Sequence, residues 1–175
     1  MQYVFYTADV FTKQIFSGAQ IAVFPSAEGL GKNQMLAISK ELNLSETVFV
    51  FKGGDDSDRR RIRIFSPQGE IDFGGHPMIA VAYVLANMGE IKLKEPYTSF
   101  VLEQNTGAID VNITPEQGRP AFVQFSLTVD PIVDKFVPTE NELASFLSID
   151  EREIRRKLYS TRLVSCGVPY LVVPV

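Results

Sequence analysis

Two side chains of this sequence could move protons, the imidazole of His76 and the carboxyl group of Glu46. His76 is the only histidine among 175 residues and lies in residues 74–77 (GGHP), whereas Glu46 lies between apolar neighbours in residues 44–47 (LSET). Histidine and partly buried carboxyl groups are the usual general acids and bases of enzymes. Two plainer interpretations stay open: Glu46 as a surface or helix-capping residue, and His76 as an N-cap bonded to backbone.

A short apolar segment follows the histidine. Only Tyr83 and Asn87 interrupt the apolar run over residues 78–88, and Gly89 then provides a C-cap. A helix that is apolar on all sides is a buried helix, and this one is too short to cross a membrane. The sequence therefore predicts a helix inside the protein.

The start of this helix is predicted to bind an anion. Gly74 and Gly75 allow a sharp turn, after which His76 would be the N-cap and Pro77 the first helical residue. The first N–H groups of a helix lack intrahelical acceptors and lie at the positive end of its dipole. Such a terminus attracts anions, and His76 would stand at its mouth.

The remaining candidate chemistry is sparse. Glu70 and Asp72 precede the glycine pair, and they could either take part in catalysis or simply end a strand. The sequence has no P-loop, no Gly-x-Ser-x-Gly elbow and no Cys-x-x-Cys pair. One histidine and one cysteine cannot build a usual zinc site, so we expect no metal. Cys166, in an apolar strand and turn, is expected to be a buried structural thiol.

Composition indicates an ordinary globular protein. The chain is 45% hydrophobic and 22% charged, and its net charge of -4 gives no basic field for nucleic acid or anionic lipid. A single cysteine suits a reducing compartment. The N-terminus lacks the features of a signal peptide, so we expect a cytoplasmic protein without membrane partners.

Hydrophobic patterning divides the chain in two. Prolines at positions 131 and 138 interrupt the pattern and place a boundary near residue 130, with domains at 1–129 and 130–175. Strands are predicted over residues 3–11, 19–24, 47–51, 59–65, 97–104, 108–113 and 120–129, and an amphipathic helix over residues 33–42.

The second domain is predicted to be short. Thr139 and Glu142 have the spacing of a capping box that opens a helix. A strand, a turn at Cys166 and a final apolar run over residues 170–175 follow, so the sequence predicts a domain cut off before its partner strands. Two polar segments, the turn at 53–58 and the basic cluster at 152–157, are expected to be solvated.

Four segments within residues 1–90 resemble, in matching order, the PhzF-like family of phenazine biosynthesis, and a fifth, later segment resembles the strand-Gly-strand that opens that family's second lobe. They are residues 9–12 (DVFT), 44–49 (LSETVF), 62–67 (IRIFSP), 70–77 (EIDFGGHP) and 166–170 (CGVPY). Members of this family are isomerases and epimerases related in fold to diaminopimelate epimerase.

The resemblance implies an α+β fold of two lobes, each a curved mixed sheet or barrel wrapped round a central apolar helix, with the second lobe incomplete here. It also implies proton transfer on a small carboxylic acid, without a cofactor, in a homodimer. Glu46 would move the proton and His76 would act with it. The substrate-binding residues implied are Gly74, Gly75, Ser45 and Asp72.

Two departures from the family pattern limit this interpretation. Gly18-Ala19-Gln20 stands where the family has Gly-Asn-Pro, which leaves the substrate open. Family members are longer, and their second lobe supplies an aspartate and an anion loop that do not appear before Val175. We therefore expect the isolated 175-residue piece to be inactive unless a second lobe or a second copy completes it.

Two other functions remain as alternatives. A single lobe could be a non-catalytic small-molecule binding or regulatory module. A second acid–base group opposite Glu46 would favour the enzyme over such a module. A cysteine racemase needs a cysteine on each side of its cleft, and the single Cys166 disfavours that chemistry.

Overall fold

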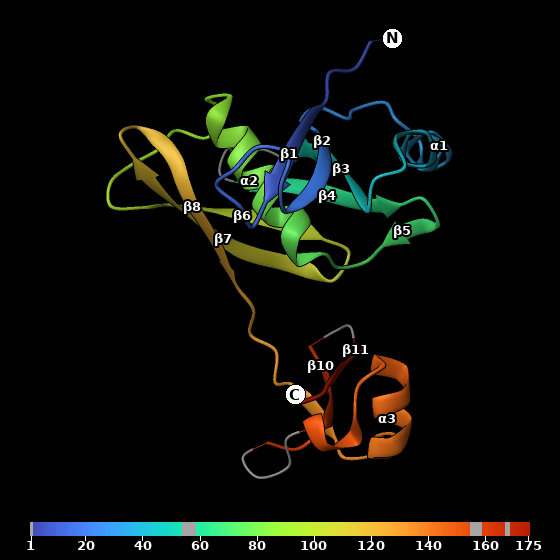
Figure 1. The fold of residues 1–175 in the computed structure, drawn as a ribbon. Helices are drawn as coiled ribbons and strands as arrows, with labels where there is room; N and C mark the ends of the chain where they lie inside the picture. Colours follow the sequence, from blue (N-terminus) through green and yellow to red (C-terminus); the bar gives the residue numbers. More distant parts are fainter. Residues whose placement is uncertain (1, 54–58, 155–158, 167–168) are drawn as a thin grey trace. The chain divides into compact units, whose positions relative to one another are not determined.

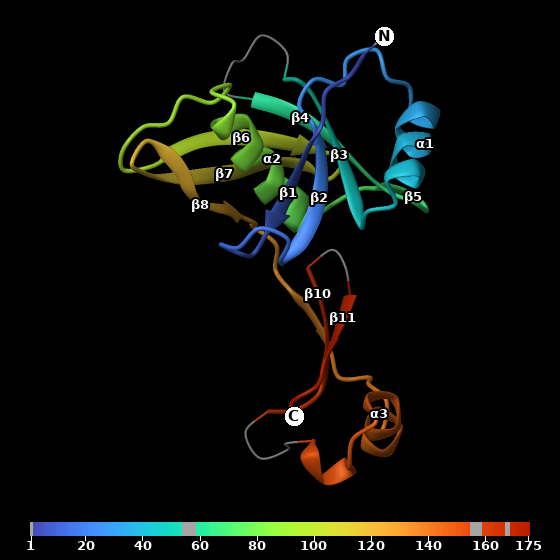
Figure 2. The same ribbon diagram turned by 45° about the horizontal axis from the view of Figure 1, so that its top comes forward.

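A computed structural model of the chain describes residues 2–53, 59–154, 159–166 and 169–175. The chain divides into two compact units, Met1–Leu127 and Thr128–Val175, which are coloured blue to gold and gold to red in Figures 1 and 2. Each unit has its own sheet and its own hydrophobic core. Residues 54–58 of the predicted polar turn and 155–157 of the predicted basic cluster lie outside the described residues.

The first unit is built on one mixed sheet. Its strands run in the order β1-β2-β3-β4-β6-β7-β8, with β5 paired to β4. The β2–β3 and β4–β6 pairs are parallel and the other neighbours are antiparallel. The strands are β1 (Tyr6–Val10), β2 (Ala19–Phe24), β3 (Glu46–Lys52), β4 (Arg59–Ser66), β5 (Gly69–Ile71), β6 (Thr98–Gln104), β7 (Gly107–Glu116) and β8 (Arg119–Ser126).

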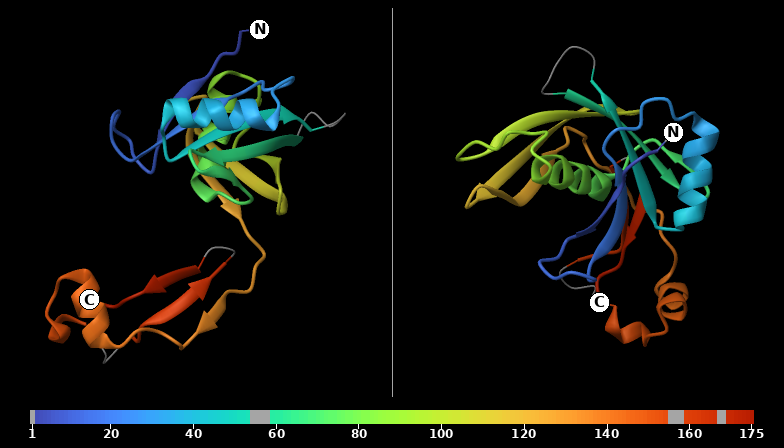
Figure 3. Two further views of the ribbon diagram at one scale, coloured as in Figure 1. Left: turned by 90° about the vertical axis from the view of Figure 1, so that its right-hand side faces the viewer. Right: turned by 90° about the horizontal axis from the view of Figure 1, so that it is seen from above.

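This sheet curves around helix α2 (Gly75–Asn87). The strands at the two ends of the order, β1 and β8, both contact α2, as do β2, β3 and β7. A sheet whose first and last strands touch one helix must wrap round it, and Figure 3 shows α2, in green, enclosed in this way. The predicted α+β architecture with a central helix is confirmed.

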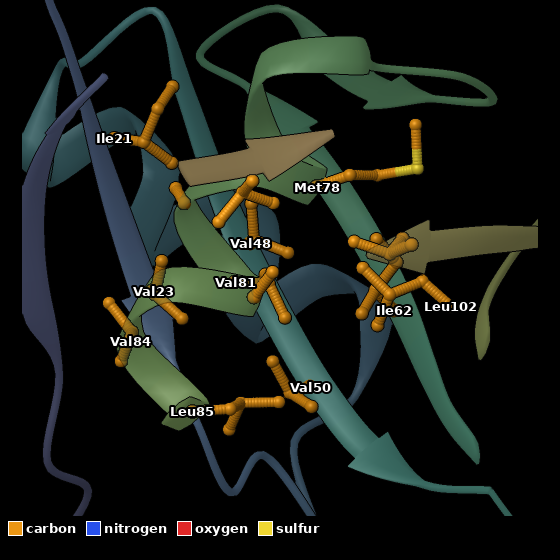
Figure 4. Close-up of a cluster of buried hydrophobic side chains, with 14 of the residues drawn as sticks. Ile21, Val23, Val48, Val50, Ile62, Met78, Val81, Val84, Leu85 and Leu102 are labelled. Carbon is orange, nitrogen blue, oxygen red and sulfur yellow. The ribbon is translucent and has the colours of Figure 1, made fainter. Parts of the chain in front are cut away.

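The central helix is buried as its apolar sequence predicts. Figure 4 shows Val81 and Leu85 of α2 pointing toward Val48 and Val50 of β3. Fully buried apolar side chains contribute about 1.5–3 kcal/mol each relative to exposed ones, so the packing of α2 on the sheet stabilises the unit. Buried α2 residues are Pro77, Met78, Ala80, Val81, Ala82, Val84, Leu85 and Ala86, whereas Tyr83 on the same helix is 44% exposed.

The predicted start of α2 was wrong by two residues. Gly74 is the N-cap, with φ −144° and ψ 122°, so His76 is the second helical residue and Pro77 the third. Proline is tolerated throughout the first turn, because none of the first four N–H groups has an intrahelical acceptor, so the position of Pro77 does not fix the start. At the other end, Met88 is the C-cap and Gly89 follows with φ +80°.

A second helix covers the opposite face of the same strands. Helix α1 (Lys32–Leu42) contacts β3 and β4, and Met35 lies in a core with Phe24, Phe49 and Phe65. Side chains alternate along a strand. In β3, Val48 therefore faces α2 and Phe49 faces α1, which places the side chain of Glu46 on the α2 face.

The second unit is smaller and its sheet is largely exposed. Its elements are β9 (Ile132–Asp134), α3 (Glu140–Leu147), a 3-10 turn at Glu151–Glu153, β10 (Arg162–Ser165) and β11 (Pro169–Val172), with the sheet order β11-β10-β9. Leu143, Ala144 and Ile154 form its buried cluster. The predicted capping box is confirmed, since Thr139 accepts a hydrogen bond from the Glu142 N–H.

The predicted burial of Cys166 was wrong. The sequence predicts a buried thiol, but Cys166 is exposed, because it lies just beyond the end of β10 instead of inside the strand. An apolar flanking sequence did not ensure burial in a hairpin whose strands are themselves open to solvent.

No helix among the described residues is both long and apolar enough to span a membrane.

Candidate active site

The fold brings together the two residues that sequence reasoning selected for acid–base chemistry. The imidazole Nε2 of His76 lies 2.8 Å from Oε2 of Glu46, although the residues are 30 positions apart. The side chains are 30% and 17% exposed, respectively, so the pair is half-buried yet open to a ligand. With Glu46 ionised, the Nε2–H donates to the carboxylate, which accepts only.

Strand pairing fixes the position of Glu46. Glu46 is the first residue of β3 and is paired with Ile21 in the parallel strand β2. Ile21 is fully buried and faces the α2 core together with Val48. The carboxyl group therefore emerges at the edge of this core, directly beside the first turn of α2.

A buried glutamine fixes the start of α2. Gln104, at the end of β6 and only 6% exposed, accepts a hydrogen bond from the Gly74 N–H at 3.0 Å. Its amide also donates to the Gly74 carbonyl at 3.3 Å. Sequence reasoning missed Gln104 because a polar residue at a strand end resembles a surface residue. The available signal was its position two residues after the buried Leu102, because residues two apart in a strand face the same side.

The two glycines lie in close contact with neighbouring side chains. A Cβ on Gly74 would lie 2.9 Å from Cγ of Pro77 and 3.1 Å from Cδ1 of Ile64. A Cβ on Gly75 would lie 3.0 Å from Cζ of Phe125 in β8. Gly74 has a negative φ, so the expected sharp turn through glycine's extra conformations is not what this position uses. The absence of side chains lets the helix start against β4 and β8.

The carboxylate of Glu70 is held by two cationic side chains. Arg63 donates two hydrogen bonds to its carboxylate, Nε to Oε1 at 2.7 Å and Nη2 to Oε2 at 2.8 Å. Lys32 Nζ lies 3.1 Å from Oε2. The Arg63 hydrogen bonds, opposed by partial burial and aided by Lys32 and Asn105, lower the pKa of Glu70 from 4.5 to about 2. Such a carboxylate is fixed in its charged form near neutral pH.

Two other predicted binding residues lie at the margin. Asp72 is exposed and its Oδ1 accepts a hydrogen bond from Asn105 Nδ2 at 3.1 Å. Ser45 is exposed and directly precedes Glu46. Within the described ranges of the chain, neither side chain is bonded to the His76–Glu46 pair. Their substrate-binding roles stay predictions.

An aromatic side chain that sequence reasoning did not single out lies beside the pair. The ring centroid of Phe11 is 6.2 Å from that of His76, with an interplanar angle of 46°. Phe11 directly follows β1, although the sequence predicted a strand that included it, and the available signal was its place in the segment DVFT.

Across the part of the chain that the structure describes, no group of three or more His, Cys, Asp or Glu side chains is placed to hold a metal ion.

Comparison with known proteins decides the family. A model of the phenazine biosynthesis-like proteins, PhzC-PhzF, matches residues 8–175. This chain belongs to the PhzC-PhzF family. The five sequence segments had indicated the same family, so that prediction is confirmed. The match includes both units of the chain.

Several curated relatives of this PhzC-PhzF member carry isomerase names. An uncharacterized isomerase of Mesorhizobium japonicum is 35% identical over 167 residues, covering 95% of this chain and 54% of the relative. The trans-2,3-dihydro-3-hydroxyanthranilate isomerase of Pseudomonas aeruginosa is 32% identical over 123 residues, covering 67% of this chain and 44% of the relative. The chain thus spans about half the length of the curated relatives it matches.

Solved structures share the fold. A PhzF-family protein of Bacillus anthracis superposes with a TM-score of 0.85 at 24% identity, covering 100% of this chain and 56% of that one. A probable proline racemase of Agrobacterium radiobacter gives a TM-score of 0.55 at 17% identity, over 89% of this chain and 48% of that one. These likenesses support the racemase- and epimerase-like α+β architecture.

Proposed function

We propose that this chain carries the acid–base site of an isomerase or epimerase that moves a proton on a small carboxylic acid. The observation that carries the proposal is the 2.8 Å bond between His76 Nε2 and Glu46 Oε2, made at the first turn of a buried helix. The isomerase names of the curated relatives support the same reaction class.

The substrate carboxylate would bind at the first turn of α2. N–H groups there lack intrahelical acceptors and lie at the positive end of the helix dipole. Gln104 holds the Gly74 backbone, and Gly75 packs against Phe125, so the turn has a fixed position. Donors that are fixed before binding cost little to reorganise during the reaction.

Glu46 would then act as the base. Its carboxylate takes the proton from the carbon next to the substrate carboxylate, and the C–H electron pair spreads into the adjoining carboxylate or conjugated system. The α2 N–H groups stabilise the added negative charge. Return of the proton to a different carbon completes an isomerisation with no oxidant, reductant or cofactor. His76 orients the Glu46 carboxyl group through the Nε2 bond.

The 175-residue chain by itself is proposed to bind the acid more readily than it turns it over. Its curated relatives are about twice as long, and epimerisation requires a second acid–base group on the opposite face of the carbon. The homodimer and the cytoplasmic location that the sequence predicts stay predictions.

A test of the proposal can use His76 as a single reporter. Because the chain has one histidine, its imidazole protons give one set of signals in an NMR spectrum. We expect but-3-enoate to shift these signals and the neutral but-3-enamide to leave them in place. Proton removal and return at one carbon need a single base, whereas net turnover needs the second group. We therefore also expect the chain, although incomplete for turnover, to accelerate deuterium uptake into but-3-enoate from D2O over buffer.

The outcomes separate the alternatives. Equal shifts with the acid and the amide would overturn the carboxylate site. Binding of but-3-enoate with no accelerated deuterium uptake would instead favour the non-catalytic binding module.

A further inference from the structure

A hollow of about 320 Å³ lies beside the C-terminal end of α2, away from the acid–base pair. Its lining includes Glu90 and Ile91, which follow the end of the helix, whereas His76 lies in the first turn. The helix has 13 residues and is therefore about 20 Å long. The volume is at the lower end of the range for small-molecule pockets, so a small ligand would fit.

Cationic side chains dominate the lining of this hollow. Arg60, Lys92 and Lys94 line it together with a single carboxylate, that of Glu90, although the whole chain has a net charge of -4. Among the residues that the structure describes, neither Lys92 nor Lys94 forms an ion pair. The two ammonium groups are therefore available to an anion.

The segment that carries the two lysines is held on both sides. The Ile91 N–H donates to the Leu85 carbonyl at 3.3 Å, and the Lys94 N–H donates to the Thr98 hydroxyl at 2.7 Å. Ile91 and Leu93 also pack against the core around α2. A ligand that binds to a fixed backbone loses little affinity to the ordering of that backbone.

A plainer role for the lysines is to complement the negative end of the α2 dipole. The carbonyls of residues 84–86 already accept hydrogen bonds from the N–H groups of residues 88–91, so no lysine is needed to bond them. The same dipole end and the Glu90 carboxylate weaken the attraction of an anion to the hollow. An anion with two charges therefore matches the three cations better than one with a single charge.

We propose that this hollow is a second binding site, for a phosphate monoester of a small organic molecule. Lys92 and Lys94 contact the phosphate oxygens, since an ammonium group binds phosphate as a point charge. Ile91 and Phe100 line the same hollow and give the organic part an apolar contact. The site shares no residue with the acid–base pair, so it does not depend on the proposed function.

The test is an NMR titration of the 15N-labelled 175-residue chain with phenyl phosphate. We expect the amide signals of residues 90–94 and 98–100 to shift with phenyl phosphate, and to shift little with phenol or acetate. The His76 imidazole signals, read in the same titration, report separately on the start of α2. The double variant Lys92→Gln and Lys94→Gln should bind phenyl phosphate at the hollow about tenfold or more weakly, because both contacts to the charged group are lost.

The double variant Lys40→Gln and Lys135→Gln is the matched control. Both lysines are exposed and lie outside the hollow, so the control has the same net charge as the test variant. We expect it to bind phenyl phosphate within about twofold of wild type. A dispersed amide spectrum checks that each variant is folded.

Three outcomes would overturn the proposal. The first is no shift of the hollow signals with phenyl phosphate in the wild-type chain. The second is equal weakening in the two double variants, which would reduce the effect to net charge. The third is binding of the chain to phosphatidic acid vesicles without binding of phenyl phosphate, which would assign the hollow to a lipid headgroup with the same phosphate chemistry.

Discussion

Two carboxylates near the start of α2, those of Glu46 and Glu70, have opposite surroundings. Glu70 is held by the guanidinium of Arg63 and the amino group of Lys32. Glu46 is bonded instead to the imidazole of His76, whose Nε2 lies 2.8 Å from Oε2 of Glu46.

The contrast teaches that burial and proximity to a helix terminus do not identify a base by themselves. Glu70 and Glu46 are comparably shielded, with side chains 11% and 17% exposed. What differs is the partner. The cations around Glu70 lower its pKa to about 2, which suits a permanent structural charge and makes it a poor base.

The largest expected effect is that of removing the Glu46 carboxylate. Glu46→Gln should lower the rate of deuterium uptake into but-3-enoate by about 10²–10⁴-fold, because the amide cannot accept the proton. Binding of but-3-enoate, followed at His76, should weaken by less than about threefold. Glu70→Gln is the matched control at the other carboxylate and should leave the uptake rate within about threefold of wild type. An uptake rate in Glu46→Gln near that of wild type would remove Glu46 from the mechanism.

Lowering the pH should reveal the contribution of the Glu70 carboxylate to the free energy of unfolding. Because folding lowers the pKa of Glu70 from 4.5 to about 2, its ionised form stabilises the folded state above pH 4.5. That contribution is lost as pH falls toward 2, and a shift of this size corresponds to about 3 kcal/mol. Urea unfolding followed by circular dichroism measures it, since the chain has no tryptophan.

Other carboxylates also titrate in this range, so the informative quantity is the difference between two chains. The free energy of unfolding of the wild type minus that of Glu70→Gln should shrink by about 3 kcal/mol between pH 6 and pH 2. A difference that stays constant with pH would mean that Arg63 and Lys32 do not hold Glu70 in its charged form.

A smaller effect tests what positions His76. Gln104→Ala removes two hydrogen bonds to the Gly74 backbone and should lower the free energy of unfolding by about 1–2 kcal/mol. It should also weaken but-3-enoate binding, because the first turn of α2 loses its support. Gln124→Ala, an exposed position on β8, serves as the control. Equal binding by the two variants would show that Gln104 does not position the turn.

The smallest expected effect lies at the edge of the Glu70 network. Lys32 is 64% exposed, and ion pairs of such residues contribute little. Lys32→Ala should therefore lower the free energy of unfolding by less than about 1 kcal/mol, as measured by urea unfolding. A loss comparable to that of Glu70→Gln would assign the stabilising role to Lys32 instead of Arg63.

The sequence predicted the parts that depend on periodicity and composition. The apolar run behind His76 predicted a buried helix, because a helix buried on all sides is apolar throughout. The alternation over residues 59–65 predicted β4, because a strand buried on one face alternates between apolar and polar residues. It could not fix the helix start at Gly75, since proline is accepted anywhere in a first turn.

Long-range partners escaped prediction for a different reason. Gln104 bonds Gly74 across 30 positions, and Phe11 lies by His76 across 65, contacts that only the curvature of the sheet creates. The Glu46–His76 pair was expected as a site through family resemblance, whereas its 2.8 Å bond comes from the parallel β2–β3 pairing and the start of α2.

The most direct measurement is an intermolecular NOE experiment on the 175-residue chain with bound but-2-enoate. The account predicts NOEs between the His76 imidazole protons and the proton on C2 of the acid, the carbon next to the carboxylate. An absence of NOEs to His76, with contacts instead from the hollow of about 320 Å³ lined by Arg60, Lys92 and Lys94, would contradict it.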